Sequence, residues 1–518
     1  MARRLLVVVS LAFLGAGCGG AATGGSGGDA GDALAYLPAD ATTVVLVSTD
    51  VDGDQWEQLD RRIVQRLDDE EGPENFEDYA TEAAKDAGLD WKADIKPLLG
   101  NDIAVGVMGD PASLLGGEGD SGIVAALDTR GGDIEEVLKT AKFEELGEAG
   151  GAKLFGFEDE EEAVIAVEDG VLIYAEDDKS LRAALARRDS GEGLEEAAVD
   201  DALADLPEES IARAYGTLRG IAEQEQLSRF AEVPLVQALE AWGLTVAFEG
   251  SKLNVDLAVG LDGDKIDEGD LPLVTGSDAP EIVIRERELS GGNRNQSQTT
   301  AFLLRALRAG YPNSRFVKAA DAIEKELGID FEQEILRQFD GPSASYVSPD
   351  GKIFAARSEV RDPEALKAVL PKLAPHLPTL VEGLQGLQSE GMALLFLFAP
   401  DAPAAAPMQN VQVDPPTTED GFYRISGLTG DGPAELYLGL VGDVFVVASD
   451  ETRAREIAKA DTESADGAQG AGVLRADLQR LADRIDYFGF FPIQGKELVA
   501  SLEASTEELR ARVRVDLG

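Results

Sequence analysis

The sequence is poor in the residues that most metal and redox sites require. Its 518 residues include one cysteine and one histidine. A single cysteine excludes disulfide bonds within the chain and cysteine-rich metal or iron–sulfur sites, and a single histidine excludes histidine-rich metal centres. We therefore expect no bound cofactor.

Positive charge is also scarce. The chain carries 46 Lys and Arg against 98 Asp and Glu, for a formal net charge of −52. A surface this negative repels nucleic-acid phosphates, so we expect no nucleic-acid partner. Apolar residues make up 44% of the chain, enough to bury real cores. The length predicts about two to four domains.

Neither of two apolar runs, 5–14 and 392–399, approaches the roughly 20 residues that a membrane-spanning helix needs. The first run follows Arg3 and Arg4 and precedes the small residues Gly15, Ala16 and Gly17. A short positive start, a short apolar run and small residues are typical of a secretory signal.

Cys18 comes directly after these small residues, and residues 15–18 resemble a bacterial lipoprotein box, with Gly15 in place of the usual Leu. The resemblance implies that residues 1–17 are removed and that Cys18 carries a lipid. The alternative is an ordinary core cysteine. Residues 18–30 are rich in Gly and Ser and predict a flexible tether. We expect a bacterial envelope protein, lipid-anchored to the extracytoplasmic face of a membrane.

The rest of the chain contains one pattern twice. Residues 31–265 and 281–518 show the same turns, helix ends and alternating strands in the same order, separated by an acidic linker at 266–280. The alternating strand 253–261, for example, corresponds to 509–517. We predict two tandem repeats with the same topology.

Within each repeat the strands alternate between apolar and polar residues and are joined by tight turns. Such strands pair antiparallel, with one face buried. Helices, among them one over 218–242, are expected to cover that face. The predicted fold class is α+β, with a mainly antiparallel sheet covered by helices.

Two motifs resemble those of a bacterial family of exported proteins that is known only as a domain of unknown function. They are Pro-Ala-Asp at 38–40, where the first strand starts, and Asp-Ile-x-Pro-x-Leu-Gly at 94–100. One departure is Leu98, where many relatives carry Trp. The resemblance covers most of the mature chain and implies an envelope location, but no activity or catalytic residue.

The sequence contains no recognisable catalytic motif. His376 lies between Pro375 and Leu377 without an identifiable polar partner, whereas a catalytic base needs an orienting group and a nucleophile. Asp50, Asp52 and Asp54 suggest calcium, but Gln55 stands where an EF-hand loop needs Gly, so an acidic turn is the simpler interpretation. We expect no enzymatic activity; a hydrolase that relies on carboxylates alone is the alternative.

Two regions are candidate interaction surfaces. The first is the basic segment 282–320, with Arg285, Arg287, Arg294, Arg305 and Arg308. These arginines are either neutralised by acids of the same chain or form a docking surface for an acidic envelope component.

The second region is an insertion at about 375–420 in the second repeat. It has leucines at helical spacing from Leu377 to Leu387, then an uncharged run from 392 to 399. The insertion either extends the core or contacts a hydrophobic partner or lipid. The candidate contact residues are Met392, Leu395, Phe396 and Phe398.

The function predicted from these features is non-catalytic binding at the cell envelope. Three hypotheses remain open, and each predicts different geometry. A protein–protein interaction module predicts an exposed flat surface or groove. A carrier of a hydrophobic or lipid ligand predicts an apolar cavity lined by strand residues and the insertion. A hydrolase predicts converging carboxylates with raised pKa values in a cleft.

Overall fold

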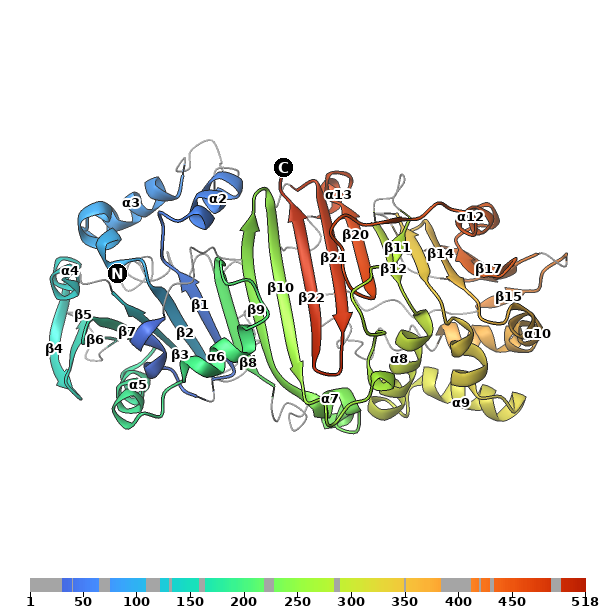
Figure 1. Ribbon diagram of the computed structural model, residues 1–518, viewed down its shortest axis with the longest axis horizontal. Helices are drawn as coiled ribbons and strands as arrows, with labels where there is room; N and C mark the ends of the chain where they lie inside the picture. The colour runs from blue at the N-terminus through green and yellow to red at the C-terminus, as the bar shows by residue number, and fades with distance from the viewer. Residues whose placement is uncertain are drawn as a thin grey trace.

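The structure is a computed structural model. It describes residues 30–39, 41–64, 75–108, 122–129, 133–157, 164–218, 228–283, 289–348, 351–382, 411–418, 421–428, 433–485 and 495–518. The molecule is elongated, with the N-terminal half at one end and the C-terminal half at the other (Figure 1).

The described elements of the first half are η1 (Gly31–Tyr36), β1 (Thr43–Ser48), α2 (Asp54–Arg62), α3 (Phe76–Asp86), η3 (Trp91–Ile95), η4 (Lys96–Leu98), β2 (Asp102–Met108), β3 (Gly122–Asp128), α4 (Ile134–Thr140), β4 (Phe143–Ala149), β5 (Ala152–Phe157), β6 (Ile165–Glu168), β7 (Val171–Ala175), α5 (Asp178–Ser190), α6 (Glu196–Leu203), β8 (Ala212–Thr217), η7 (Ser228–Phe230), α7 (Pro234–Ala238), β9 (Leu239–Glu249) and β10 (Lys252–Leu261).

The described elements that follow are η8 (Glu268–Asp270), β11 (Glu281–Ile282), β12 (Leu289–Asn293), α8 (Gln296–Gly310), α9 (Arg315–Leu327), η9 (Phe331–Ile335), η10 (Leu336–Gln338), β13 (Ser343–Val347), β14 (Phe354–Glu359), α10 (Pro363–Leu373), η11 (Ala374–His376), β15 (Gln412–Asp414), β16 (Tyr423–Ser426), β17 (Glu435–Val441), β18 (Val444–Ala448), α12 (Glu451–Ile457), β19 (Glu463–Ser464), β20 (Gly472–Asp477), α13 (Leu478–Ile485), β21 (Glu497–Ala504) and β22 (Glu508–Asp516).

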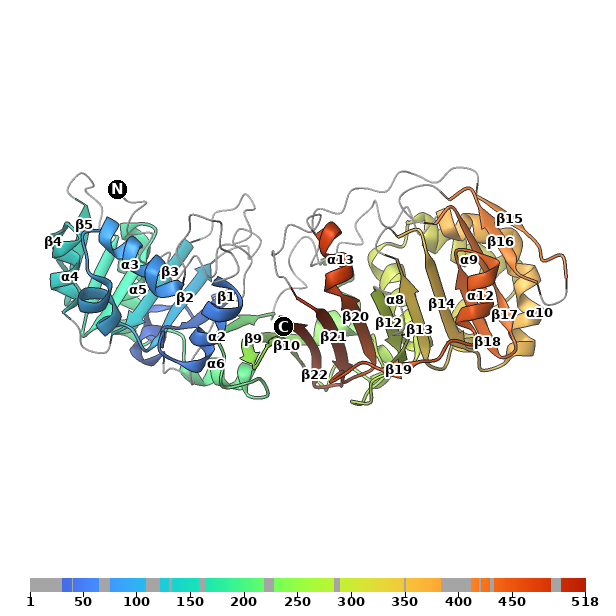
Figure 2. The ribbon, with the colours of Figure 1, turned by 90° about the horizontal axis from the view of Figure 1, so that it is seen from above.

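All the described strands except β11 and β19 belong to one sheet of 20 strands, and every pairing in it is antiparallel. The predicted α+β class with a mainly antiparallel sheet is confirmed. Seen from above, the sheet forms a shallow arch (Figure 2).

The strand order is the same in both halves. In the first half β6, β7, β3, β2, β1, β8, β9 and β10 pair in that order. In the second half the order is β17, β18, β14, β13, β12, β20, β21 and β22. The last strands of the halves, β10 and β22, then pair with each other along nine residue pairs, Lys252↔Asp516 to Gly260↔Glu508. Nothing in the sequence predicted this central pairing.

The halves also match in local structure. Each has a single π-helical turn between a helix and a strand, η3 in the first half and η9 in the second. The side chains of Asp90 and Asp330 accept backbone N–H bonds at the start of these turns. Gly88 and Gly328, just upstream, have φ of 79° and 65°, a left-handed conformation that favours glycine. Since π-helical turns are rare, a matched pair is informative.

The sheet is covered on both faces in the first half. On one face, η1 and α5 pack on β3 and β7 around a core that includes Tyr36, Val124 and Leu181. On the other, α3, α4 and the η3 turn cover Ile103 and Leu127. Strand residues alternate between these faces, as the period-two pattern predicted.

Two expectations from the sequence need revision. The helix predicted over 218–242 is wrong at its end, because residues 239–242 start strand β9 and only Pro234–Ala238 are helical immediately before it. From Leu239 onward the apolar residues Leu244, Val246 and Phe248 alternate, and this period-two pattern prevails.

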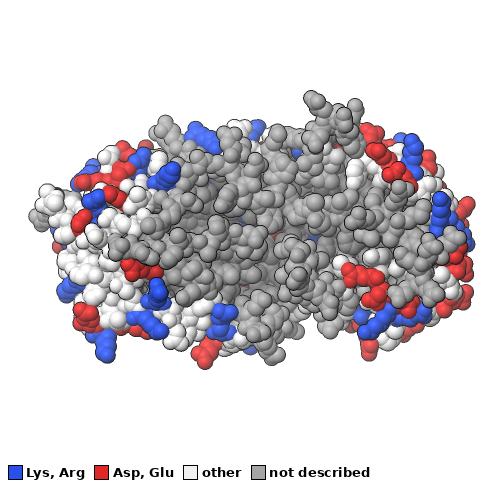
Figure 3. Space-filling view, turned by 180° about the vertical axis from the view of Figure 1, so that it is seen from behind, with Lys and Arg blue, Asp and Glu red and all other residues white. Residues whose placement is uncertain are grey.

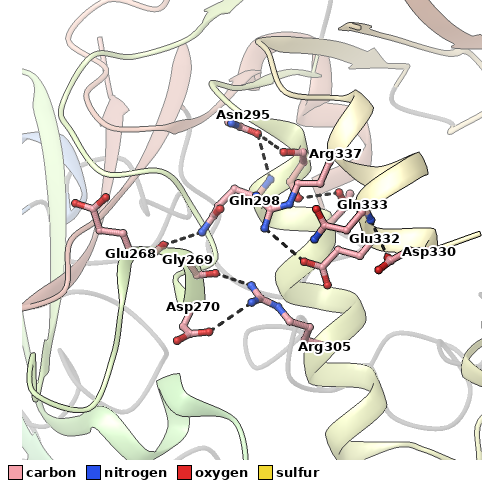
Figure 4. Close-up of polar contacts among 12 residues, drawn as sticks. Glu268, Gly269, Asp270, Asn295, Gln298, Arg305, Asp330, Glu332, Gln333 and Arg337 are labelled. Carbon is pink, nitrogen blue, oxygen red and sulfur yellow. Dashed lines mark hydrogen bonds and ion pairs between the residues drawn. The ribbon is translucent and has the colours of Figure 1, made fainter. Parts of the chain in front are cut away.

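The expected linker at 266–280 is packed against both halves. Leu271 is fully buried, in a cluster that joins Leu261 of the first half to Ala504 of the second. Helix α8 holds this segment: the Gln298 side-chain amide donates to the carbonyl oxygen of Glu268 at 2.8 Å, as Figure 4 shows. The same amide donates to the carbonyl oxygen of Leu271, also at 2.8 Å. The segment therefore ties the halves together.

Candidate functional site

An apolar cavity of about 130 Å³ lies in the first half, between the sheet and its helices. The sheet contributes Ile103, Leu127 and Leu172 to its wall. The helical side contributes Ala84, Trp91 and Leu138 among others. A void of this size is unusual, because protein interiors are close-packed.

Aromatic side chains form one wall of this cavity. The rings of Trp56 and Phe76 lie 4.5 Å apart between centroids, and those of Phe76 and Trp91 lie 5.9 Å apart with their planes at 81°. Trp91 is the first residue of the π-helical turn, which the Asp90 cap starts. The cap thus helps to place the Trp91 ring against Phe76.

Two polar side chains at the cavity, those of Thr49 and Trp56, form hydrogen bonds to the backbone. The Thr49 hydroxyl donates to the Asn101 carbonyl and accepts from the Gly100 N–H, both at 2.6 Å. The Trp56 indole N–H donates to the Ser48 carbonyl at 3.2 Å. Burial, followed by the nearby Glu176 carboxylate, raises the pKa of Tyr174, so its hydroxyl is neutral at physiological pH. Such a cavity suits an apolar group.

The corresponding place in the second half contains larger side chains. Leu99, directly after η4, corresponds to Phe339, directly after η10. Leu172, the second residue of β7, corresponds to Phe445, the second residue of β18. The rings of Phe339 and Phe445 are in contact, with centroids 5.2 Å apart. Two leucines that line the first cavity are therefore replaced by a packed aromatic pair.

The three described arginines of the predicted basic surface all contact the chain itself. Arg294 donates to the carbonyl oxygens of Thr275 and Asp278. Arg305 binds the Gly269 carbonyl and Asp270, as Figure 4 shows, and Arg308 pairs with two carboxylates of α9. On the face seen from behind, Lys and Arg lie among Asp and Glu at both ends of the molecule (Figure 3). Arg305 and Arg308 are therefore paired with acids of the same chain, whereas the partners of Arg294 are neutral carbonyl oxygens.

Several candidate residues lie outside the described part of the chain. They are Cys18, Arg285, Arg287, Met392, Leu395, Phe396 and Phe398. The described flanks of the insertion belong to the core: Leu377 and Leu380 pack with Ile323 and Phe331, and residues 412–414 form β15.

The residues considered for chemistry are dispersed. His376 Nε2 lies 3.9 Å from Glu326, and Asp52 binds Lys96 at 2.7 Å. Within the described ranges, no three His, Cys, Asp or Glu side chains gather as metal ligands would. Nor is any helix there long and apolar enough to cross a membrane.

The described carboxyl groups with a clearly altered pKa are all shifted downward. Backbone hydrogen bonds lower the pKa of Asp177 and Asp516, and the Arg424 side chain lowers that of Glu435. At Asp450, hydrogen bonds from Arg453 outweigh burial, which acts in the opposite direction. A general acid at neutral pH needs a raised pKa, so these groups are suited to structural roles.

Sequence reasoning missed the cavity. Its sheet and helix residues are the ordinary apolar residues of a core, and their pattern predicts burial whether or not the packing is complete. One signal was present: Ala80 and Ala84, four residues apart, place small side chains on the inner face of α3, opposite the sheet. Small residues there leave space that larger ones would fill.

The family comparison gives a match over residues 5–365, to a model described as "Protein of unknown function (DUF3352)". No curated protein matches the chain. Among solved structures, crystal form III of TP0453 aligns with 10% identity and a TM-score of 0.26, over 46% of this chain and 82% of that one. Crystal form I of TP0453 gives 12% identity and 0.24, over 46% and 81%. Likenesses this weak do not establish a shared fold.

Proposed function

This chain belongs to the DUF3352 family of proteins of unknown function, and we propose that it is a lipid-anchored protein of the bacterial cell envelope that binds a hydrophobic ligand and catalyses no reaction. The observation that carries the proposal is the apolar cavity between the sheet and helices α3 and α4. Of the three hypotheses from the sequence, only the carrier requires an apolar cavity, although this cavity lies in the first half and not at the insertion, where the sequence predicted it.

The cavity suits an apolar ligand in both size and chemistry. Its volume of about 130 Å³ is close to that of an engineered cavity of roughly 150 Å³, lined by aliphatic and aromatic residues, that stays dry and binds benzene. Transfer of each methylene group from water into such a site contributes about 0.8 kcal/mol. The end of an acyl chain is a ligand of this kind.

The location rests on the first thirty residues. A lipid on Cys18 and a Gly-rich tether to residue 30 would hold the folded body beside a membrane. Such a position gives the cavity access to acyl chains. The test is Cys18→Ala, with Ser10→Ala as a matched control. The Cys18→Ala protein is expected in the soluble fraction and the control in the membrane fraction; Cys18→Ala protein that still sediments after a salt wash would contradict the anchor.

We also propose that the two halves are copies of one module. The identical strand order and the paired π-helical turns support this duplication. After duplication, the aromatic pair Phe339 and Phe445 would have filled one site, while Leu99 and Leu172 keep the other open. On this account binding belongs to the first half.

The second half suggests the variant that tests binding. The double variant with Leu99→Phe and Leu172→Phe introduces the aromatic pair of the second half into the first-half cavity. Trp56 and Trp91 both line the cavity, so their fluorescence reports on occupancy, and Trp242→Phe removes the third tryptophan. The parent is expected to show a saturable change with a zwitterionic short-chain lipid, and the double variant none.

Leu146→Phe is the control for added bulk, because Leu146 on β4 is 41% exposed and is not part of the cavity wall. This control should bind as the parent does. Equal binding by the parent and the double variant would show that the ligand does not enter the cavity, and a parent that binds none would refute the proposed function.

A further inference from the structure

Among the described side chains that line the first-half cavity, those of Thr49, Trp56, Trp91 and Tyr174 carry a hydrogen-bond donor. The Thr49 hydroxyl and the Trp56 indole N–H donate to backbone carbonyl oxygens. Within the described ranges, neither the Trp91 indole N–H nor the Tyr174 hydroxyl has a hydrogen-bond partner. These two donors of the cavity wall are therefore available to a ligand.

The Tyr174 side chain leaves the sheet on the side of the cavity. In β7, Tyr174 lies opposite Ala125 of β3 and Ile165 of β6, and both of these residues line the cavity. Residues directly opposite each other in antiparallel strands have their side chains on the same face. The Tyr174 ring packs in one cluster with Ile134 and Leu138 of α4. It therefore belongs to the sheet side of the cavity wall.

The Tyr174 hydroxyl is an uncharged group in partly desolvated surroundings. The side chain is partly buried, and this burial is the main cause that raises its pKa. A polar group that is withdrawn from water without a hydrogen-bond partner is destabilising. A ligand atom that accepts a hydrogen bond from this hydroxyl would remove that penalty.

Two other tyrosine hydroxyls have partners within the chain. Tyr36 donates to the Glu168 carboxylate at 2.8 Å, and Tyr437 donates to the Glu435 carboxylate at 3.0 Å.

The corresponding place in the second half has no hydroxyl. Tyr174 is the fourth residue of β7, and Val447 is the fourth residue of β18. The second half thus differs from the first in two ways at this site: an aromatic pair fills the space, and valine replaces the tyrosine. The open space and the available hydroxyl occur together in the first half.

The charges near the cavity favour a neutral acceptor on the ligand. The Glu176 carboxylate is close enough to contribute to the raised pKa of Tyr174. The whole chain carries a net charge of −52. Both charges repel a carboxylate or phosphate that approaches the hydroxyl. The carbonyl oxygen of an ester or ketone accepts a hydrogen bond without carrying a charge.

We propose that the Tyr174 hydroxyl donates a hydrogen bond to the ligand, and that the ligand is an uncharged molecule with a small apolar body and one carbonyl group, as in a short acyl ester. This inference rests on the proposed function, which requires only that the ligand is apolar. The cavity of about 130 Å³ holds the apolar body, and the hydroxyl selects the carbonyl group. Tyr174 is thus a residue that determines specificity.

Two probes of equal size test the hydrogen bond. Acetophenone and cumene have nearly the same shape, but only acetophenone has a carbonyl group. The protein is the full chain with Cys18→Ala, so that no covalent acyl group competes, and binding is measured by isothermal titration calorimetry. Tyr174→Phe should weaken acetophenone by roughly twofold to tenfold, the effect of one hydrogen bond, and leave cumene unchanged.

Two substitutions serve as controls. Trp91→Phe removes the other available donor and keeps an aromatic ring, as Phe331 does at the start of the π-helical turn of the second half. It should change the affinities for both probes by the same factor. Tyr437→Phe removes a tyrosine hydroxyl that is not part of the cavity wall, and it should affect neither probe.

Infrared spectroscopy of the bound probe supplies a readout that a change in packing alone would not move. A hydrogen bond to a carbonyl oxygen lowers its stretching frequency. Isotopically labelled acetophenone should therefore absorb at a lower frequency when it is bound to the parent than when it is bound to the Tyr174→Phe variant. Equal frequencies would show that Tyr174 does not donate to the carbonyl group.

A second pair of probes tests the charge of the ligand. Methyl hexanoate is an uncharged ester, whereas hexanoate is an anion at neutral pH. The ester should bind more tightly than the anion, because Glu176 and the net charge of the chain repel a carboxylate. Binding of hexanoate at least as tight as that of the ester would overturn the inference of an uncharged ligand.

The outcomes separate this inference from the proposed function. If cumene binds but Tyr174→Phe leaves acetophenone unchanged, the role of Tyr174 is wrong and the cavity function stands. The same holds if Trp91→Phe, and not Tyr174→Phe, weakens acetophenone relative to cumene. If none of the probes binds to the parent, the proposed function fails as well.

Discussion

At the residue scale, two leucines distinguish the halves. Leu99 and Leu172 leave space where Phe339 and Phe445 make a 5.2 Å ring contact. Filling a cavity commonly adds about 0.5–2 kcal/mol to the free energy of unfolding. The double Leu→Phe variant is expected to lose binding but to have a free energy of unfolding at least as large as that of the parent. A loss of binding in this variant would therefore not be caused by unfolding.

Helix caps are residue-scale features that the sequence predicted well. An Asp directly before a helical pattern predicts a cap, and Asp133 and Asp362 follow this rule: their carboxylates accept backbone N–H bonds from Glu136 and Ala365. Capping depends on a few neighbouring residues and is therefore visible in a short stretch of sequence. The cavity depends on side-chain volumes from segments far apart in the chain, and no local pattern encodes it.

Asp450, the cap of α12, gives a prediction with a defined pH dependence. The pKa of the folded-state Asp450 carboxyl lies below the usual value. The ionised carboxylate therefore stabilises the protein at any pH above its unfolded-state pKa of about 4. This stabilisation is lost as the pH falls through the lower folded-state pKa. Asp450→Ala should lower the free energy of unfolding by about 1 kcal/mol at neutral pH. Urea unfolding at about pH 7 and about pH 3 should show a smaller difference at the acidic pH; an unchanged difference would contradict this role.

At the element scale, the insertion at about 375–420 was the least predictable segment. Its leucines at helical spacing favoured core packing, and residues up to 382 do continue beyond α10, with Leu380 buried to 7% exposure. The alternative, contact with a hydrophobic partner, relied on residues 392–399, which are outside the described ranges. A run of apolar residues alone does not distinguish the core from a partner.

Leu380 tests whether the start of the insertion supports the second half. Leu380→Ala should lower the free energy of unfolding by roughly 2–5 kcal/mol, since it removes buried side-chain volume beside Ile323 and Phe331. Thermal unfolding of this variant beside Leu146→Ala, a leucine 41% exposed, provides the comparison. Equal stability of both variants would show that the segment is not part of the core.

At the scale of the whole molecule, the sequence predicted two separate repeats, whereas in the structure the two halves of the chain share one sheet. The pairing of β10 with β22 was hidden because each strand already had a partner, β9 or β21, within its own half. An alternating strand predicts which of its faces is buried, but it does not reveal what pairs with its second edge.

This central pairing predicts cooperative unfolding. Val513 lies in β22 between β10 and β21, so Val513→Pro removes an N–H from the middle of the sheet and should destabilise both halves together. Hydrogen exchange should show protection lost in β1 and β2 as well as in β20 and β21. Loss confined to the second half would show that the halves fold independently.

The central claim is that the first-half cavity holds an acyl chain. The most direct measurement is native mass spectrometry of the Cys18→Ala protein from its own cells, compared with the same protein carrying Leu99→Phe and Leu172→Phe. We predict bound lipid on the first protein, released on activation, and none on the second. Lipid bound equally to both proteins, or to neither after incubation with the zwitterionic short-chain lipid, would contradict the account.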